Sequence, residues 1–322
     1  MANKIKAVVL AAGKSLRMKS EKTKVLHKIL GKEIINYLLD SLVACGIAEQ
    51  DIIVVVGDNR AEIAGAVKRN VVYAIQQEQL GTAHALLTAG EYIARHEGEL
   101  LVVVGDNPYI TAGALQKLIA CHRQGRAQCT FISAVFPGNP PPYGRVIRDE
   151  QGEVRGIVEE KDASPEQRQI REVNAAIYLF ENRIIFPLLA RIANRNAKKE
   201  YYLTDIIAIL QRENLAVQAV QVDDCAIAIG INDRWELQQA HNKFNHQIQQ
   251  RLIMENGVTI LQPETVTIEH DVEIGLDTVI YPCTYLAAGA RIGTNCVIGP
   301  FVYLKNVHVN DGEKVIFEKR EA

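Results

Sequence analysis

The stretch IEHDVEIGLDTVIYPCTYLAAGARIGTNCVIGPFVYL, residues 268–304, has an aliphatic residue at every sixth position. These positions are Ile268, Ile274, Ile280, Leu286, Ile292, Ile298 and Leu304. Neither an α-helix nor an ordinary strand has a period of six, whereas a parallel β-helix places one inward aliphatic residue on each flat face. The pattern therefore predicts a short left-handed parallel β-helix of a little over two coils, at about three hexads a coil. The alternative is a chance aliphatic run in an ordinary β domain.

A long amphipathic helix is expected just before this repeat. Asn232 and Asp233 are suitable capping residues for its start, and the pair Asn256-Gly257 for its end. Its apolar residues share one stripe: Leu237, Ala240, Phe244, Ile248 and Leu252. We therefore predict three parts of the chain, a domain at 1–232, a connecting helix at 233–256 and the β-helix at 257–322.

The first 232 residues alternate short aliphatic runs with helical patterns, which is typical of an α/β domain. Ile5–Leu10, Ile52–Val56 and Leu100–Val104 are continuous and rich in β-branched residues, as buried strands are. Residues 34–45 and 83–94 show helical spacing. The segment YGRVIRDEQGEVRGIVEE, residues 143–160, alternates as a hairpin does, with a turn at 149–152. The expected fold is Rossmann-like, with a mixed, mainly parallel sheet.

Composition excludes several classes of protein. At 322 residues the chain is long enough for two domains, and 48% hydrophobic with 23% charged residues disfavours disorder. A net charge of −2 gives the whole molecule no attraction to nucleic acid or to an anionic membrane. No apolar run reaches the ~18 residues of a membrane span, and the first residues lack a signal-peptide pattern, so we expect a cytoplasmic protein. Six cysteines without a CxxC pair predict reduced, mostly buried thiols.

The richest candidate for chemistry is LAAGKSLRMKSEKTKVLHKILGK, residues 10–32. A strand ends at Leu10, and small residues then allow close approach of a ligand to the backbone. Five cations follow within eleven residues: Lys14, Arg17, Lys19, Lys22 and Lys24. Such a turn suits a polyphosphate, although it matches neither the GxGxxG nor the GxxxxGK[ST] pattern. The alternative is a solvated basic loop.

The pattern LAAGxxxRM followed by KVLHKILGK resembles the sugar-nucleotide pyrophosphorylases, and among them most the N-acetylglucosamine-1-phosphate uridyltransferases. Further blocks follow in the family's order, among them QQEQLGTAHAL (76–86), VGDNPYI (104–110), EVNAAIY (172–178) and EYYLTDII (200–207). The resemblance implies a nucleotidyltransferase that makes UDP-N-acetylglucosamine, a cell wall precursor, and pyrophosphate from UTP and N-acetylglucosamine-1-phosphate. It implies Mg²⁺ as the cofactor and a homotrimer formed through the β-helix, with no nucleic acid or membrane partner.

The resemblance also implies roles for individual residues. Arg17 and Lys24 would be catalytic, and Asp106 and Asn232 would hold the metal. The nucleotide would contact Leu10, Ala11, Ala12, Gly13, Gln76, Gly81 and Thr82. The sugar would contact Gly144, Glu159, Asn174, Tyr202 and Thr204. Taken singly, Asp106 and Asn232 are also suitable as capping residues, and the Gly81-Thr82 segment as a helix start.

Several positions depart from the family pattern. Ser15 and Leu16 stand where Gly and Thr are usual, and Thr23 replaces a common Pro. We therefore expect weaker affinity for UTP if position 15 needs a positive φ. Nearer the sugar, Ala175 and Ala176 replace a usual Thr-Gly pair, and Asn107 and Tyr109 replace apolar residues.

These departures leave alternatives open. One is the same reaction with another sugar-1-phosphate or with dTTP, and another is a sugar-nucleotide sensor that does not catalyse. Because the distal coils that carry acetyl transfer in bifunctional relatives are missing here, we also expect no acetyltransferase activity, and no special role for His308.

Overall fold

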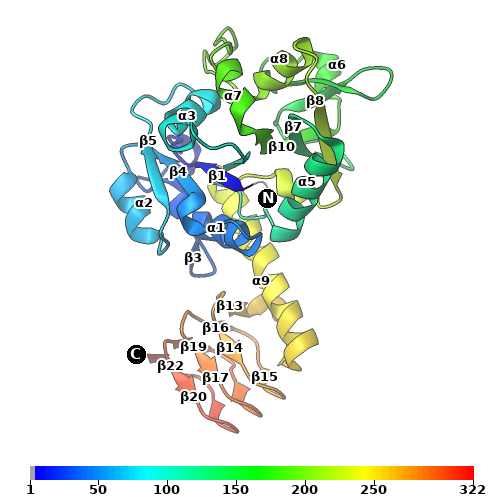
Figure 1. The fold of residues 1–322 in the computed structure, drawn as a ribbon. Coiled ribbons are helices and arrows are strands. Elements are labelled where there is room, and N and C mark those ends of the chain that lie inside the picture. The colour runs from blue at the N-terminus through cyan, green and yellow to red at the C-terminus, as the bar shows by residue number, and fades with distance from the viewer. Residues whose placement is uncertain (1–3) are drawn as a thin grey trace. The chain divides into compact units, whose positions relative to one another are not determined.

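The computed structural model describes residues 4–322 and divides into two units (Figure 1). The first contains the chain up to Leu26 together with Ile34–Ile231, and the second contains His27–Glu33 together with Asn232–Ala322. The short hairpin of β2 (Lys28–Ile29) and β3 (Lys32–Glu33) groups with the second unit, although the sequence places it in the first domain. The reason is local, because the Leu30 carbonyl accepts a hydrogen bond of 3.1 Å from the His270 N–H.

The first unit is built on a nine-stranded sheet in the order β11-β7-β10-β6-β1-β4-β5, in which β8 also pairs with β10, and β9 pairs with β8. Its strands are β1 (Ile5–Leu10), β4 (Ile52–Val56), β5 (Val72–Ile75), β6 (Glu99–Val104), β7 (Cys129–Val135), β8 (Arg145–Arg148), β9 (Val154–Val158), β10 (Glu172–Glu181) and β11 (Val217–Val222). The pairs β1–β4, β1–β6, β4–β5 and β7–β11 are parallel, whereas β10 runs antiparallel to β6 and β7. The mixed, mainly parallel sheet of the prediction is confirmed.

Both faces of this sheet are buried, which explains why its central strands are apolar without alternation. In β1, Ala7 and Val9 pack into one hydrophobic cluster and Val8 into the other. Leu38 of α1 and Leu115 of α5 belong to the first cluster. The helices are α1 (Ile34–Ala44), α2 (Arg60–Ala66), α3 (Thr82–Thr88), α4 (Gly90–Ile93), α5 (Ala112–Gly125), α6 (Pro165–Arg168), α7 (Asn182–Leu189) and α8 (Ile206–Arg212).

Two local predictions in this unit have different outcomes. The hairpin of β8 and β9 is confirmed, and its turn is held by the Asp149 carboxylate, which accepts from the N–H groups of Gln151 and Glu153 at 3.0 and 2.8 Å. The helical spacing over residues 83–94 is confirmed, but the structure divides this segment into two helices, α3 and α4. The second of them starts at Gly90, a poor helix former.

Short 3₁₀ helices fill several connections: η1 (Leu16–Met18), η2 (Lys24–Leu26), η3 (Glu49–Asp51), η4 (Leu203–Asp205), η5 (Cys225–Ala228) and η6 (Pro263–Thr265). Among residues 4–322, no helix has both the length and the apolar character that crossing a bilayer requires. All six cysteines are free thiols. Only Cys129 and Cys296 are buried, so the expectation that most would be buried is wrong.

Besides the β2–β3 hairpin, the second unit contains α9 (Arg234–Asn256) and a parallel β-helix. Helix α9 begins at Asp233, whose carboxylate accepts from the Glu236 N–H at 2.9 Å, and ends at Gly257 with φ 64°. The three flat faces have the strand orders β12-β15-β18-β21, β13-β16-β19-β22 and β14-β17-β20, and every pair is parallel. The left-handed parallel β-helix is confirmed as the fold of this unit.

The β-helix is longer than the hexads alone predict. Its strands are β12 (Thr259–Ile260), β13 (Thr267–Ile268), β14 (Glu273–Ile274), β15 (Val279–Ile280), β16 (Thr284–Leu286), β17 (Arg291–Ile292), β18 (Val297–Ile298), β19 (Val302–Lys305), β20 (His308–Val309), β21 (Lys314–Val315) and β22 (Lys319–Glu321). All seven predicted inward residues are buried, and so are Val309 and Val315. Val309 lies five positions after Leu304 and not six, so a strict period of six does not predict the inward residues beyond Leu304.

Candidate active site

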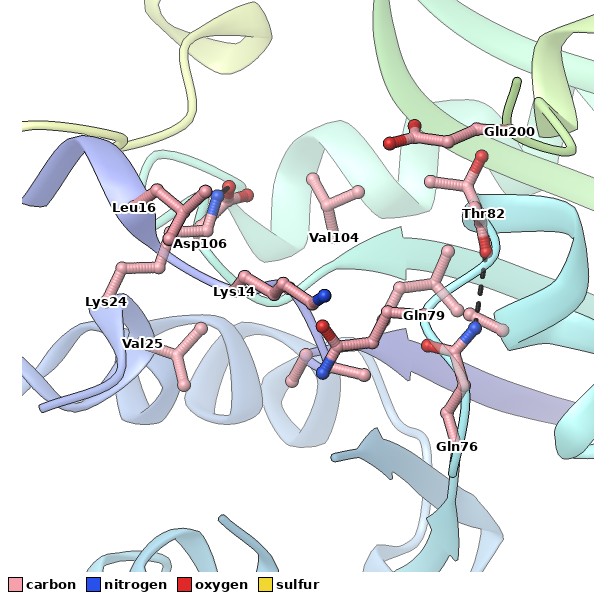
Figure 2. A pocket seen from close by; sticks show the side chains of 16 residues that line it. Lys14, Leu16, Lys24, Val25, Gln76, Gln79, Thr82, Val104, Asp106 and Glu200 are labelled. Carbon is pink, nitrogen blue, oxygen red and sulfur yellow. Dashed lines mark hydrogen bonds and ion pairs between the residues drawn. The ribbon is translucent and has the colours of Figure 1, made fainter. Parts of the chain in front are cut away.

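A cavity of about 390 Å³ in the first unit lies at the carboxyl ends of β1 and β6 (Figure 2). This is the edge at which open α/β sheets bind ligands. The lining residues are Leu10, Ala11, Ala12, Gly13, Lys14, Leu16, Lys24, Val25, Gln76, Gln79, Gly81, Thr82, Ala85, Val104, Asp106 and Glu200. All seven residues expected to contact a nucleotide are among them, together with Lys24 and Asp106.

The loop after β1 is held close to the sheet by its small residues. The N–H of Ala11 donates to the Val55 carbonyl at 2.8 Å, and the N–H of Gly105 donates to the Leu10 carbonyl at 2.9 Å. A side chain at Gly105 would approach the Ala11 methyl group to 3.0 Å, so this pair of loops needs small residues at both positions. Ala11 and Ala12 are buried and Gly13 is exposed, so the backbone becomes accessible at the start of the cationic segment.

Ser15 has a positive φ of 55°, which is the condition under which the loss of the family's glycine matters. Its hydroxyl accepts a hydrogen bond of 2.9 Å from the N–H of Lys24. A serine in place of the usual glycine therefore costs backbone strain but adds a link between the loop and the segment that carries Lys24. Its neighbour Leu16 is 81% exposed and lines the cavity, where the family has a hydroxyl group.

Lys24 and Asp106 form an ion pair inside the cavity, with 18% and 13% of their side chains exposed. Asp106 lies just beyond β6, and its carbonyl accepts from the Ile231 N–H at 2.9 Å. A Cβ at Gly230 would lie 3.0 Å from the Asp106 Oδ1 atom, so the glycine lets the backbone pass close to the carboxylate. The buried Asn107 supports this loop, since its Nδ2 donates to the Ile227 carbonyl at 2.6 Å.

Two of the expected residues are not among those that line the cavity. Arg17 is exposed on η1 and is not among the residues that line the cavity. Asn232 belongs to the second unit, where its N–H donates to the Glu236 carboxylate at 2.6 Å. Their roles at the phosphates and at the metal stay predictions.

The far end of the cavity is formed by the segment between β5 and α3. Gly81 has φ 119°, and a Cβ there would lie 2.5 Å from the Tyr201 carbonyl oxygen, so only glycine fits. The Thr82 hydroxyl accepts from the Leu203 N–H at 2.9 Å. Gln76 is buried, and its amide nitrogen lies 2.9 Å from the Nδ1 atom of His84. Thr82 therefore joins this end of the cavity to the segment that carries Tyr202 and Thr204.

Four of the five expected sugar residues lie together beside this segment. The Glu159 carboxylate accepts from the Thr204 hydroxyl at 3.0 Å, and the Asn174 N–H donates to the Gly144 carbonyl at 2.9 Å. A Cβ at Gly144 would lie 3.3 Å from Glu159 Oε1. Asn174 precedes an irregularity in β10 where Ala176 has φ 55°, so the alanine adopts a conformation that usually needs glycine.

Two carboxyl groups around these residues have raised pKa values. Burial raises the pKa of Glu159, and burial followed by the charges of Glu159 and Asp162 raises the pKa of Asp205 to about 6. Tyr202 is buried, its hydroxyl has no hydrogen-bond partner in the described part of the chain, and burial is the main cause that raises its pKa to about 12. A buried hydroxyl beside a shifted carboxylate favours a polar ligand here.

Glu160, the neighbour of Glu159, forms ion pairs of its own. It forms ion pairs with the buried Arg145 at 2.9 Å and with Arg168 at 3.3 Å. Glu159 lies just after the end of β9, so the two neighbours are separated by a turn and not by the alternation of a strand.

Sequence reasoning missed Gln79, Val104 and Glu200, which line the cavity. Gln79 lies inside the quoted QQEQLGTAHAL block, and Glu200 opens the EYYLTDII block, so proximity to a motif was the available signal. Nothing in the sequence pattern distinguishes Gln79 and Glu200 from solvated polar residues, or Val104 from an ordinary strand residue.

Comparison with known proteins agrees with this geometry. Residues 6–236 match the family model described as nucleotidyl transferase, and residues 271–306 match bacterial transferase hexapeptide repeats. The chain is 41% identical over 315 residues to the bifunctional protein GlmU of Brevibacillus brevis, covering 98% of this chain and 68% of the relative. It is 44% identical over 309 residues to bifunctional protein GlmU of Pelotomaculum thermopropionicum, covering 96% and 67%.

A third relative, the bifunctional protein GlmU of Acetivibrio thermocellus, is 42% identical over 309 residues. This match covers 96% of the chain and 66% of the relative, so the chain spans about two thirds of the length of such proteins. The nucleotidyl transferase match contains the whole lined cavity, and the hexapeptide match falls on the β-helix. The chain therefore belongs to the nucleotidyl transferase family, as an enzyme that resembles the N-acetylglucosamine-1-phosphate uridyltransferases and carries a C-terminal hexapeptide β-helix.

Proposed function

We propose that the first unit is a Mg²⁺-dependent uridylyltransferase that forms UDP-N-acetylglucosamine and pyrophosphate from UTP and N-acetylglucosamine-1-phosphate. The observation that carries the proposal is the composition of one cavity. The small-residue loop, the Gln76–Thr82 segment, Lys24 and Asp106 come from separate parts of the chain and line the same 390 Å³ space. That set offers backbone N–H groups, a base-binding amide, a cation and a carboxylate, which are the groups that a nucleoside triphosphate requires.

In the proposed reaction, a phosphate oxygen of the sugar-1-phosphate attacks the α-phosphorus of UTP. The new bond joins that oxygen to the α-phosphorus, and the bond from the α-phosphorus to the bridging oxygen of pyrophosphate breaks. The phosphate oxygen carries no proton to be removed near neutral pH, so no general base is needed. The contribution of the protein is alignment of the two substrates and neutralisation of their charge, for which Lys24 and Lys14 are the cations that line the cavity.

The residues present fit a magnesium ion. Mg²⁺ keeps several waters and binds proteins through one or two carboxylates together with substrate phosphates, and Asp106 supplies one partly buried carboxylate at the phosphate end of the cavity. When bound, the ion would neutralise phosphate charge and orient the triphosphate. The Lys24 side chain forms an ion pair with this carboxylate.

The sugar is proposed to lie against Gly144, Glu159, Asn174 and Thr204, with the buried Tyr202 hydroxyl near its phosphate. The contacts among these residues support one polar surface. A carboxylate of raised pKa and an amide together can accept and donate to sugar hydroxyls and to an N-acetyl group. The proposal covers uridylyl transfer alone, because only the nucleotidyl transferase match contains this site.

The test is release of pyrophosphate from a panel of UTP, dTTP and CTP, each with N-acetylglucosamine-1-phosphate, glucosamine-1-phosphate and glucose-1-phosphate, with and without Mg²⁺. We expect the highest turnover with UTP, N-acetylglucosamine-1-phosphate and Mg²⁺. Higher turnover with dTTP or another sugar would replace the proposed substrates, and tight nucleotide binding with no turnover on any pair would favour a sensor.

For the second unit we propose that it assembles the enzyme into a homotrimer. The β-helix exposes stacked aromatic rings. Tyr285 stacks on Tyr303 on one flat face at 5.6 Å between centroids, and Phe301 stacks on Phe317 at the bends before β19 and β22 at 5.7 Å. Phe301 and Phe317 are 62% and 70% exposed. Molar mass in solution, measured by light scattering, should be three times that of the chain, and a monomer would contradict the proposal.

A further inference from the structure

The hydrogen bonds of Gln76 determine which way its side-chain amide points. The terminal atom assigned as Nε2 lies 3.4 Å from the Gly81 carbonyl oxygen and 2.9 Å from the Nδ1 atom of His84. A backbone carbonyl only accepts, so the atom that faces it must be the nitrogen and not the oxygen of the amide. The dashed line in Figure 2 marks this bond to Gly81.

The tautomer of His84 follows from the same geometry. Because the amide nitrogen of Gln76 donates, the Nδ1 atom that faces it accepts, and neutral His84 therefore carries its proton on Nε2. The Gly81 carbonyl alone holds the amide weakly at 3.4 Å, so the shorter bond to His84 is the main restraint on its orientation.

This arrangement leaves one group of Gln76 for a ligand. In the described part of the chain, both hydrogen bonds of its side chain use the nitrogen, and Gln76 lines the cavity. Its oxygen is therefore the group that can accept from a nucleobase. In Figure 2 the oxygen lies on the side of Gln79, away from the nitrogen and its bond.

We infer that His84 is a positioning residue that selects the nucleobase by presenting the Gln76 oxygen, and not its NH₂ group, to the ring nitrogen N3 of a pyrimidine. Uracil and thymine carry a proton on N3 and can donate to that oxygen. Cytosine has an unprotonated N3, so two acceptors would face each other. Selection of this kind is strong because the mismatched pair leaves buried acceptors without a donor.

The inference rests on the proposed function, since it names how the proposed UTP site rejects other bases. It adds His84, a residue that does not line the cavity. Without the His84 acceptor, the Gln76 amide is free to rotate by half a turn and offer its NH₂ group, which cytosine accepts and uracil does not.

The experiment compares wild type, His84→Ala, His84→Leu and His84→Asn. Asn is the matched control, because its side-chain oxygen can replace the Nδ1 acceptor at a similar distance from the helix. Dissociation constants for UTP, dTTP and CTP are measured by calorimetry on each full-length variant, and kcat and KM for UTP by pyrophosphate release. Circular dichroism checks that each variant is folded.

We expect wild type to bind UTP and dTTP more tightly than CTP. Both His84→Ala and His84→Leu should reduce the ratio of CTP to UTP dissociation constants about tenfold, the effect of one lost hydrogen bond, and raise KM for UTP with little change in kcat. The Asn variant should keep the wild-type ratio. A base preference that is unchanged in both apolar variants, an Asn variant as unselective as the Ala variant, or a wild type that binds CTP as tightly as UTP would overturn the inference.

Failure of the proposed function gives a different result. A wild type that prefers UTP and loses this preference in the Ala and Leu variants, but releases no pyrophosphate with any sugar-1-phosphate, would refute the transfer reaction and support base selection by His84. A wild type that binds none of the three nucleotides would overturn both.

Discussion

At the scale of single residues, the serine at position 15, where the family usually has glycine, makes one unfavourable and one favourable contribution to the stability of the fold. Its φ of 55° costs an L-residue about 1 kcal/mol, while its hydroxyl accepts a 2.9 Å hydrogen bond from Lys24, which contributes about 1 kcal/mol. We predict that Ser15→Ala, which keeps the strain and loses the bond, destabilises the protein by about 1 kcal/mol.

Ser15→Gly loses the bond but also relieves the strain, so its free energy of unfolding should stay near that of wild type. Denaturant titration of both variants measures the difference. An Ala variant more stable than the Gly variant would show that the backbone at this position is not strained.

Asp205 gives a prediction about pH. Burial and the charges of Glu159 and Asp162 raise its pKa from 3.8 to about 6, so the folded state holds this proton more tightly than the unfolded state. Its favourable contribution to stability is complete below about pH 4 and is lost as pH rises through about 6. Because the side chain is only half buried, solvent screening reduces the cost of its charge at higher pH to about 1 kcal/mol.

Asp205→Asn removes that charge and should stabilise the protein by about 1 kcal/mol at pH 8, with no gain at pH 4. Thermal unfolding at the two pH values measures this. An equal gain at both would mean that the effect of the substitution does not come from ionisation.

Lys24 and Asp106 carry the prediction about catalysis at this scale. Alanine at either position removes a charge that lines the cavity, so turnover should fall by about 10²-fold or more while Tm changes by only a few degrees. Parallel pyrophosphate-release and melting curves test this. Loss of turnover matched by loss of folded protein would make the pair structural.

At the scale of elements, the β-helix is held together by its inward stack. Ile298 is fully buried between β-strand neighbours of the coils above and below, whereas Val297 beside it points outward and is half-buried. Ile298→Ala should destabilise the second unit by about 3 kcal/mol, from lost burial and the cavity that remains, and Val297→Ala by much less. Equal shifts of the melting transition would contradict the assigned inward face.

The elements that could be predicted from the sequence are those whose pattern depends on burial alone. β1 and β4 match the predicted ranges because both their faces are covered, and the hexad residues match because each points inward. The break between α3 and α4, the hairpin at Lys28–Glu33 and the positive φ of Ala176 depend on tertiary neighbours, which no local pattern contains.

The candidate site divides in the same way. Motif positions such as Asp106, Gln76 and Gly81 could be assigned because the chain order of the blocks is informative. The contacts between side chains could not be predicted. The hydrogen bond between Gln76 and His84 and the ion pair of Glu160 with Arg145 depend on positions that only the folded chain determines.

At the scale of the whole molecule, a chain with net charge −2 contains a site that we propose for a triphosphate. These two facts agree because the cations that the site needs are concentrated in one loop and its neighbour Lys24, while ion pairs neutralise charge elsewhere, as Arg148–Glu172 and Arg123–Glu99 do. The lined cavity lies wholly within the first unit.

The most direct test of the central claim, that this cavity transfers a uridylyl group, is the initial rate of pyrophosphate release from UTP and N-acetylglucosamine-1-phosphate with Mg²⁺. It is measured for wild type, Asp106→Ala and the control Glu150→Ala, an exposed carboxylate in the β8–β9 turn. We predict rapid release by wild type and the control, and a rate at least about 10²-fold lower for Asp106→Ala. Equal rates for all three proteins, or no release by wild type, would contradict the claim.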